Sequence, residues 1–270
     1  MNKTSGIGVI YYNFSFNDFP DFFNWCREHQ VNFVEIQANS LYQTGQPEEM
    51  AEKVAVLLDE YHLCVSQLSA GNDFIQQTPE DLEKQINRMH QVFKLAHLLG
   101  TNLIRVDGGW PKEGVEESKF AKLILYGLEK TVEMAEKEDI YLALDNHGSV
   151  TNNYQFQLEL LTQISSKRLG ANLDTMNYRW YGYSVEELPS IYEKIAPYVR
   201  HTHLKDGVGA RSEYQGKVLG QGEIPLSTAF SILKKHGYTG VWCVEYEGAD
   251  KEKGYAESVA WLRKQLAELI

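Results

Sequence analysis

The chain has 270 residues and a formal net charge of −11, with 43% hydrophobic and 23% charged residues. These fractions are typical of a globular domain, and no apolar run approaches the roughly 18 residues of a membrane span. A negative net charge opposes contact with phosphate backbones, so we do not expect a nucleic-acid partner. The lack of a spanning run predicts that no membrane partner is involved. Residues 1–6 lack the apolar segment of a secretion signal, which predicts a cytoplasmic location.

Short β-type runs alternate with longer amphipathic stretches along the whole chain, and no low-complexity linker separates them. This organisation predicts a single domain over residues 1–270. The expected strands cover residues 7–14, 32–37, 63–68, 102–106, 141–144, 169–173, 198–204 and 241–244. Expected helices cover residues 19–29 and 118–137, and others begin at Pro47, after Thr78, near Ser184, near Ile224 and towards the C-terminus.

Eight βα units in succession predict the α/β class and a closed (β/α)8 TIM barrel. The alternative is an open doubly wound sheet, which often carries a glycine-rich phosphate turn after its first strand. No such turn follows the first expected strand. Gly220-Gln221-Gly222 lies after the seventh strand instead, where it is either a helix-capping turn or a weak phosphate motif.

Metal-binding types of side chain stand where four successive strands end. These residues are Asp145, Asp174, His203 and Glu245. Functional groups of a TIM barrel lie at the C-terminal ends of its strands. One carboxylate there is usually a helix cap, but four such residues on adjacent strands are harder to explain as caps. Three carboxylates and one imidazole suit one divalent ion, with Mn²⁺, Mg²⁺ or Co²⁺ favoured and Zn²⁺ acceptable.

The segment His201-Thr202-His203-Leu204-Lys205-Asp206 closes the seventh strand. Alternate residues of a strand share a face, so His203 and Lys205 project towards the site with His201 one pleat deeper. We interpret His203 as a ligand and His201 as a supporting or core histidine. Lys205 either steadies a developing oxyanion or forms an ion pair at the rim, and Asp206 supports the following loop.

A divalent ion at these strand ends can hold two oxygens of a hydroxy-carbonyl substrate and stabilise an enediolate. A small hydroxy-carbonyl substrate is therefore expected. Six further residues are candidate substrate contacts: Glu35, Asp107, Trp110, His147, Asn177 and Arg211. The alternatives are a buried ion pair for Glu35 and Asp107, simple packing for Trp110, and solvent exposure for His147 and Arg211.

Several motifs then resemble the xylose-isomerase-like TIM barrel superfamily, and more narrowly its sugar phosphate isomerase/epimerase group. They are Leu144-Asp145-Asn146-His147-Gly148, Asn172-Leu173-Asp174-Thr175-Met176-Asn177, His203-Leu204-Lys205-Asp206, Gly220-Gln221-Gly222-Glu223-Ile224-Pro225 and Val244-Glu245. The resemblance implies metal ligands at Asp145, Asp174, His203 and Glu245, with Asp145 and Glu245 as the proton-transfer pair. The catalytic role of Lys205 is predicted from its place on the same strand face as His203.

One position departs from that family, whose fifth-strand ligand is usually glutamate. The shorter carboxylate of Asp145 lies about one C–C bond further from the ion, so it binds the ion through water or acts only as a base. The resemblance implies a metal-dependent sugar or sugar phosphate isomerase or epimerase. The alternatives are a polyol-ketone dehydratase on the same site and a non-catalytic sugar-binding barrel; a homo-oligomer is compatible with each. The related DNA-repair enzymes need further histidine ligands that are missing here.

Overall fold

A computed structural model describes residues 6–43 and 45–268. Eight parallel strands close into a barrel in the order β1-β10-β7-β6-β5-β4-β3-β2, which confirms the predicted TIM barrel. The barrel strands are β1 (Gly6–Ile10), β2 (Phe33–Gln37), β3 (Cys64–Ser69), β4 (Leu103–Val106), β5 (Tyr141–Asp145), β6 (Leu169–Asp174), β7 (Val199–Leu204) and β10 (Val241–Val244). Residues 1–5, on which the expectation about a secretion signal depends, lie outside the described residues.

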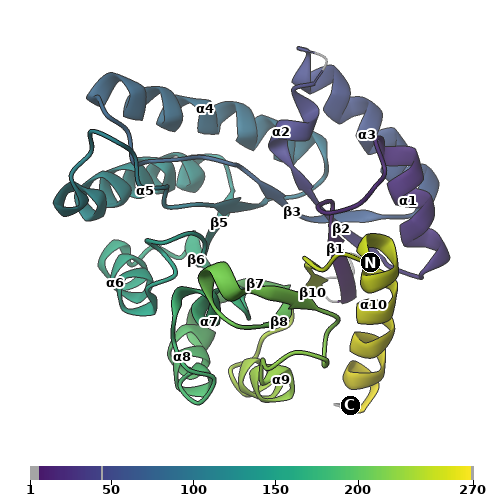
Figure 1. The fold of residues 1–270 in the computed structure, drawn as a ribbon. Helices are drawn as coiled ribbons and strands as arrows, with labels where there is room; N and C mark the ends of the chain where they lie inside the picture. Colours follow the sequence, from purple (N-terminus) through teal and green to yellow (C-terminus); the bar gives the residue numbers. More distant parts are fainter. Residues whose placement is uncertain (1–5, 44, 269–270) are drawn as a thin grey trace.

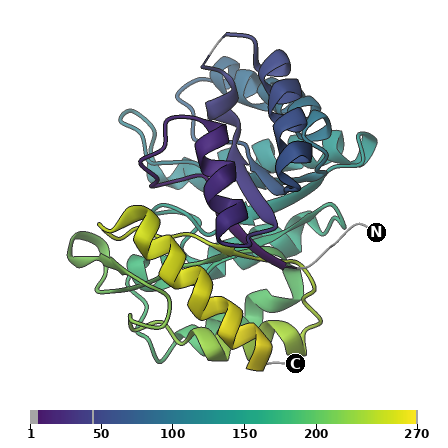
Figure 2. The same cartoon turned by 90° about the vertical axis from the view of Figure 1, so that its right-hand side faces the viewer.

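Helices form a ring around the barrel, and α10 lies beside α1 where the first and last strands pair (Figures 1 and 2). The long helices are α1 (Phe19–Glu28), α3 (Pro47–Tyr61), α4 (Pro79–Leu98), α5 (Phe120–Lys137), α6 (Tyr154–Ile164), α8 (Leu188–Ile195), α9 (Leu226–Lys235) and α10 (Lys251–Glu268). Within residues 6–43 and 45–268, no helix combines the length and apolarity needed to cross a membrane.

Local signals explain where two of these helices begin. Pro47 is the first residue of α3, and the Thr78 side chain accepts a hydrogen bond from the Asp81 amide at the start of α4. The expected start near Ser184 is displaced: Ser184 N does donate to the Glu187 side chain, but residues 184–187 form a turn and α8 begins at Leu188.

The sequence pattern did not predict several smaller elements. These are α6, the short helices α2 (Ala38–Leu41) and α7 (Asn177–Tyr181), and an antiparallel pair formed by β8 (Asp206–Val208) and β9 (Gln215–Lys217). All of them except α6 lie in the loops that follow β2, β6 and β7, at the end of the barrel where the candidate site residues cluster.

Strand residues alternate between the helices and the lumen. The outward residues of β2 and β5, such as Val34 and Leu144, are fully buried in the main hydrophobic core. A separate cluster of Ile10, Phe33, Val241 and Cys243 occupies inward-facing positions of β1, β2 and β10. Gly8 leaves room for it, because a Cβ on Gly8 would lie 2.7 Å from Val241. The upper lumen is polar instead, which places chemistry at the C-terminal strand ends.

Candidate metal and substrate site

Three of the four predicted ligands meet at the mouth of the barrel. Asp174 ends β6, His203 lies in β7 and Glu245 follows β10, and strand pairing sets Asp174 opposite His203. One ligand atom from each of the three side chains lies within 4.8 Å of the other two. The three residues are at most 6% exposed, so their polar atoms must find partners inside the site.

His203 lies between two carboxylates. Its Nε2 is 2.7 Å from Glu35 Oε2, with hydrogen-bond geometry, and its Nδ1 is 2.8 Å from Glu245 Oε2. The Nδ1 contact is not aligned as a hydrogen bond. Once Nδ1 has lost its proton, its lone pair can bind a cation while Nε2 still donates its hydrogen to Glu35. Glu35, a predicted substrate contact, is fully buried and contacts the histidine.

The charges around this histidine shift three pKa values. Burial opposes ionisation of Glu35, but the charge and hydrogen bond of His203 outweigh it and hold the pKa at about 2. Burial likewise lowers the pKa of His203, yet Glu35 and Glu245 raise it well above its ordinary value. Burial lowers the pKa of His201 to about 3, so this ring is neutral and fits the predicted supporting role.

Lys205 is a buried cation beside two of the three ligands. Its Nζ lies 3.0 Å from Asp174 Oδ2, 3.0 Å from Glu245 Oε1 and 3.2 Å from Glu247 Oε1. Burial lowers the lysine pKa, but the carboxylates raise it well above its ordinary value, so the ammonium persists. Burial raises the pKa of Asp174 to about 7 although Lys205 opposes this. Glu247 was not predicted; its position two residues after Glu245 is the signal that identifies it.

Asp145 lies outside the group of three ligands. Its Oδ2 is 3.0 Å from Arg105 Nε, and its Oδ1 accepts a hydrogen bond from Asn172 Nδ2 at 2.7 Å. His147 Nδ1 is 3.7 Å from the same Oδ2. Among the described residues, no potential metal-binding group contains Asp145. Its predicted role as a fourth ligand stays a prediction.

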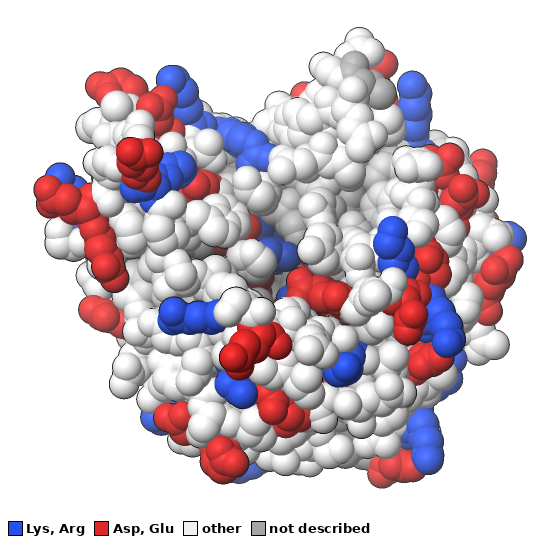
Figure 3. Space-filling model, viewed as in Figure 1, with Lys and Arg blue, Asp and Glu red and all other residues white. Residues whose placement is uncertain are grey.

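A cavity of about 440 Å³ opens above these side chains. Three predicted substrate contacts, Asp107, Trp110 and His147, line it together with Glu245 and Tyr12. Trp110 is 36% exposed, and its ring meets the His147 ring edge-on at 5.8 Å. Figure 3 shows one face of the molecule hollowed at its centre, with charged side chains on the wall of the hollow. Aromatic rings and carboxylates together suit the CH faces and hydroxyl groups of a polyol.

The two remaining predicted contacts differ in position. Asn177 is buried beside Asp174: its backbone N donates to Asp174 Oδ1 at 2.9 Å, and its side-chain Nδ2 has no hydrogen-bond partner within the described residues. Arg211 is exposed, donates to the Tyr181 carbonyl, and does not line the cavity. Asn177 lies beside the predicted ligand Asp174 but does not line the cavity either, and both roles stay predictions.

A buried amide network beneath the cavity was not predicted. Gln67 Nε2 donates to Glu35 Oε2 at 2.8 Å and to Asn172 Oδ1 at 3.1 Å, and the Ser69 hydroxyl donates to Glu35 Oε1. Through Asn172 the network also reaches Asp145. Its sequence signal is a polar residue at alternate positions of otherwise apolar strands, as in Gln67 and Ser69 of β3.

The Gly220-Gln221-Gly222 turn serves the protein's own carboxylate. Asp206 accepts hydrogen bonds from the amides of Gly207, Gly220, Gly222 and Ile224 at 2.8 to 3.2 Å. A Cβ on Gly222 would lie 2.1 Å from Asp206 Oδ1, so glycine is required by this close approach. Asp206 therefore supports the loop, as predicted, and occupies the amides that a phosphate would need.

The chemistry of the site fits a divalent cation. Asp174 Oδ2 and His203 Nδ1 are buried and lack a hydrogen-bond partner within the described residues, and the same holds for Asp145 Oδ2 beside Arg105. The site also holds more carboxylates than cations: Glu35, Asp107, Asp145, Asp174, Glu245 and Glu247 surround the permanently charged Arg105 and Lys205. Oxygen donors with one imidazole match Mn²⁺, Mg²⁺, Co²⁺ or Zn²⁺.

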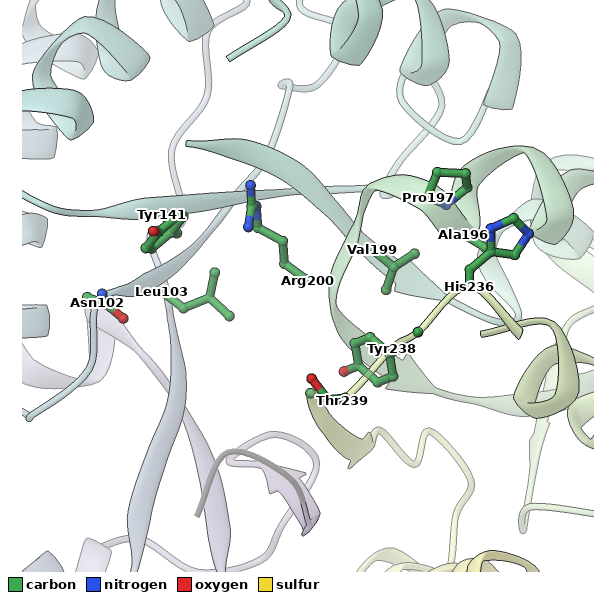
Figure 4. Close-up of a pocket in the computed structure, with 12 residues that line it drawn as sticks. Asn102, Leu103, Tyr141, Ala196, Pro197, Val199, Arg200, His236, Tyr238 and Thr239 are labelled. Carbon is green, nitrogen blue, oxygen red and sulfur yellow. The ribbon is translucent and has the colours of Figure 1, made fainter. Parts of the chain in front are cut away.

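A second hollow, of about 410 Å³, lies at the opposite end of the barrel. Figure 4 shows Tyr141 and Arg200 in it, with Tyr238 and Thr239 on another side. It contains none of the predicted site residues, and it lies among the N-terminal ends of β4, β5, β7 and β10. The mouth cavity is therefore the candidate active site.

Comparison with known proteins gives the same architecture. One similar solved structure is a D-tagatose 3-epimerase-like protein, with 21% sequence identity, a TM-score of 0.79 and 97% of each chain covered. A second is a probable 3-DHS dehydratase from Bacillus anthracis, with 17% identity, a TM-score of 0.78, and 95% of this chain and 98% of that chain covered. A third is the IOLI protein with a zinc atom, with 17% identity, a TM-score of 0.76, and 97% of this chain and 96% of that chain covered. No curated protein sequence matches. The family model described as xylose isomerase-like TIM barrel matches residues 23–265. The chain thus belongs to the xylose isomerase-like TIM barrel family.

Proposed function

We propose that the protein is a divalent-metal-dependent isomerase or epimerase of a ketose, a related polyol ketone or its phosphate. One observation carries the proposal: ligand atoms of Asp174, His203 and Glu245 lie within 4.8 Å of one another in a buried site. Membership of the family and the similarity to a D-tagatose 3-epimerase-like structure support it.

Asp174 through Oδ2, His203 through Nδ1 and Glu245 through its carboxylate would hold the ion. When bound, a divalent cation polarises a substrate carbonyl and stabilises the negative charge of an enediolate. Glu35 orients the imidazole by its hydrogen bond to Nε2.

Glu245 is the proposed base. Burial opposes its ionisation, but Lys205 and His203 outweigh this and hold its pKa well below the ordinary value. The side chain is therefore a carboxylate that can accept the proton from the carbon next to the carbonyl and return it to the neighbouring carbon, which completes an isomerisation. An epimerisation needs a second group that returns the proton from the opposite face. The Lys205 ammonium, 3.0 Å from Glu245 Oε1, supplies fixed positive charge near the oxygen that becomes negative.

Chelation and one substitution test this function. Protein treated with chelator should lose turnover of ketoses and cyclic polyol ketones, and Mn²⁺ or Co²⁺ should restore it. Glu245→Gln should remain folded and lose about 10²- to 10⁴-fold in rate, the usual contribution of a general base. Glu257→Gln, at an exposed position of α10, is the matched control and should be unchanged. Full activity of Glu245→Gln, or of the metal-stripped protein, would refute the proposal.

A dehydratase is the second candidate, because one similar structure is a probable dehydratase. The same proton abstraction would then be followed by loss of a hydroxyl group as water. The mass of the product separates the two reactions, since isomerisation conserves mass and dehydration removes one water. If no divalent ion binds in calorimetry, a non-catalytic sugar-binding barrel becomes the better reading.

A further inference from the structure

Asp145 was predicted both to bind the metal ion and to share proton transfer with Glu245, but its contacts join it to other partners. Oδ1 accepts the Asn172 amide, and Oδ2 faces Arg105 Nε at 3.0 Å. The Oδ2 contact is an ion pair without hydrogen-bond alignment. Asp145 is 0% exposed, so this guanidinium is its principal compensating charge.

Arg105 is a buried cation that needs anchoring. Its side chain is 11% exposed, and Nη2 lies 3.2 Å from Asp107 Oδ1 while Nη1 lies 3.9 Å from Glu35 Oε1. Asp145 holds Nε, so the guanidinium is fixed from two sides. The same arginine lines the mouth cavity. A planar donor fixed in this way can direct its remaining hydrogens at a substrate oxygen without losing further conformational entropy.

Strand register and chain length explain why this aspartate reaches the arginine. β4 and β5 are neighbours, and Arg105 pairs with Ala143, two residues before Asp145 on the same face. Glutamate would carry the carboxylate further from β5 by one C–C bond, about 1.5 Å. The shorter side chain of Asp145 stays beside Arg105 and outside the group of Asp174, His203 and Glu245.

We infer that Asp145 is a positioning residue that fixes Arg105 as a hydrogen-bond donor to the substrate, and that the metal ion has three protein ligands. This inference rests on the proposed function. Because three carboxylates already surround the guanidinium, the substrate oxygen it takes is a neutral hydroxyl or carbonyl group and not a phosphate.

Calorimetric titration with Mn²⁺ alone tests the ligand set. Loss of an outer-shell partner weakens metal binding by roughly 10- to 100-fold, and Asp174→Asn should cost at least as much. Asp145→Asn should lose less than about tenfold in Mn²⁺ affinity, which is less than the loss expected for an outer-shell partner. Asp145→Glu should bind Mn²⁺ no more tightly than wild type. A loss of more than about tenfold in Asp145→Asn, or tighter binding by Asp145→Glu, overturns the inference.

Two further measurements separate this inference from the proposed function. In Mn²⁺-loaded enzyme with the ketose that wild type turns over best, Asp145→Asn and Arg105→Lys should raise KM alike, and excess Mn²⁺ should rescue neither. Rescue of Asp145→Asn by Mn²⁺ would show that it is a ligand.

The second measurement needs no metal. Thermal melting of Arg105→Gln, Asp145→Asn and the double variant should give a combined loss smaller than the sum of the single losses, as for groups in contact. Additive losses overturn the ion pair. If wild type binds no Mn²⁺, the proposed function fails, and this cycle still decides whether Asp145 anchors Arg105.

Discussion

Replacing Glu35 by glutamine tests the buried contact that orients His203. The pKa of Glu35 falls from its ordinary value of 4.5 to about 2, because the charge and hydrogen bond of His203 outweigh the cost of burial. A shift of this size corresponds to about 3 kcal/mol of stability at neutral pH. Glu35→Gln keeps the shape and one acceptor oxygen but removes the charge.

The sign of the pH dependence follows from the lowered pKa. Between about pH 4.5 and pH 2 the unfolded chain binds more protons at this position than the folded chain, so the stabilisation disappears as the pH falls through that range. Glu35→Gln should therefore lower the free energy of unfolding by about 3 kcal/mol at pH 7 and by only about 1 kcal/mol at pH 3.

Urea unfolding of the metal-stripped protein at both pH values measures this difference. Glu60→Gln, at an exposed position of α3, is the matched control and should be neutral at both. An equal loss at pH 7 and pH 3 would mean that packing, and not charge, explains the effect. A variant as stable as wild type at pH 7 would refute the ion pair itself.

Two other predictions concern the ligands and the loop that follows them. The pKa of Asp174 is about 7 and that of His203 is raised, so Mn²⁺ binding at pH 7 should release about one proton or more per ion. Calorimetry in two buffers of different ionisation enthalpy measures the number of protons released. A release of zero protons contradicts the prediction. Asp206→Ala leaves four loop amides without their acceptor and should lower the free energy of unfolding by about 3 kcal/mol. Urea unfolding measures this loss, and a loss below about 1 kcal/mol would mean that water replaces the carboxylate.

The sequence pattern predicted the barrel because strand and helix periodicities persist through eight units. Alternation also predicted that Asp174, His203 and Glu245 end strands and face inward, and the structure brings these three together. Periodicity could not reveal β8 and β9, because three-residue strands leave no measurable pattern and depend on pairing between residues 206–208 and 215–217.

Sequence position could not separate Asp145 from the other strand-end acids. Which carboxylate meets which cation depends on lateral distances across the lumen, and a sequence does not contain these distances. Arg105 reaches Asp145 through the register of β4 and β5, and Glu35 reaches His203 across 168 positions of chain. Inward-facing polarity predicted that such residues share a lumen, but not which of them form pairs.

The two buried cations, Lys205 and Arg105, lie in different halves of the barrel mouth, each with its own carboxylates. Lys205 lies with Asp174, Glu245 and Glu247, whereas Arg105 lies with Asp107, Asp145 and Glu35. His203 bridges the halves, because Nε2 contacts Glu35 and Nδ1 contacts Glu245. An ion held by Asp174 and Glu245 would be repelled by the neighbouring ammonium. Glu247 lies outside the ligand group and can keep Lys205 paired while the other two carboxylates bind the ion. The proposed ion therefore lies in the Lys205 half, and the proposed substrate contact lies in the Arg105 half.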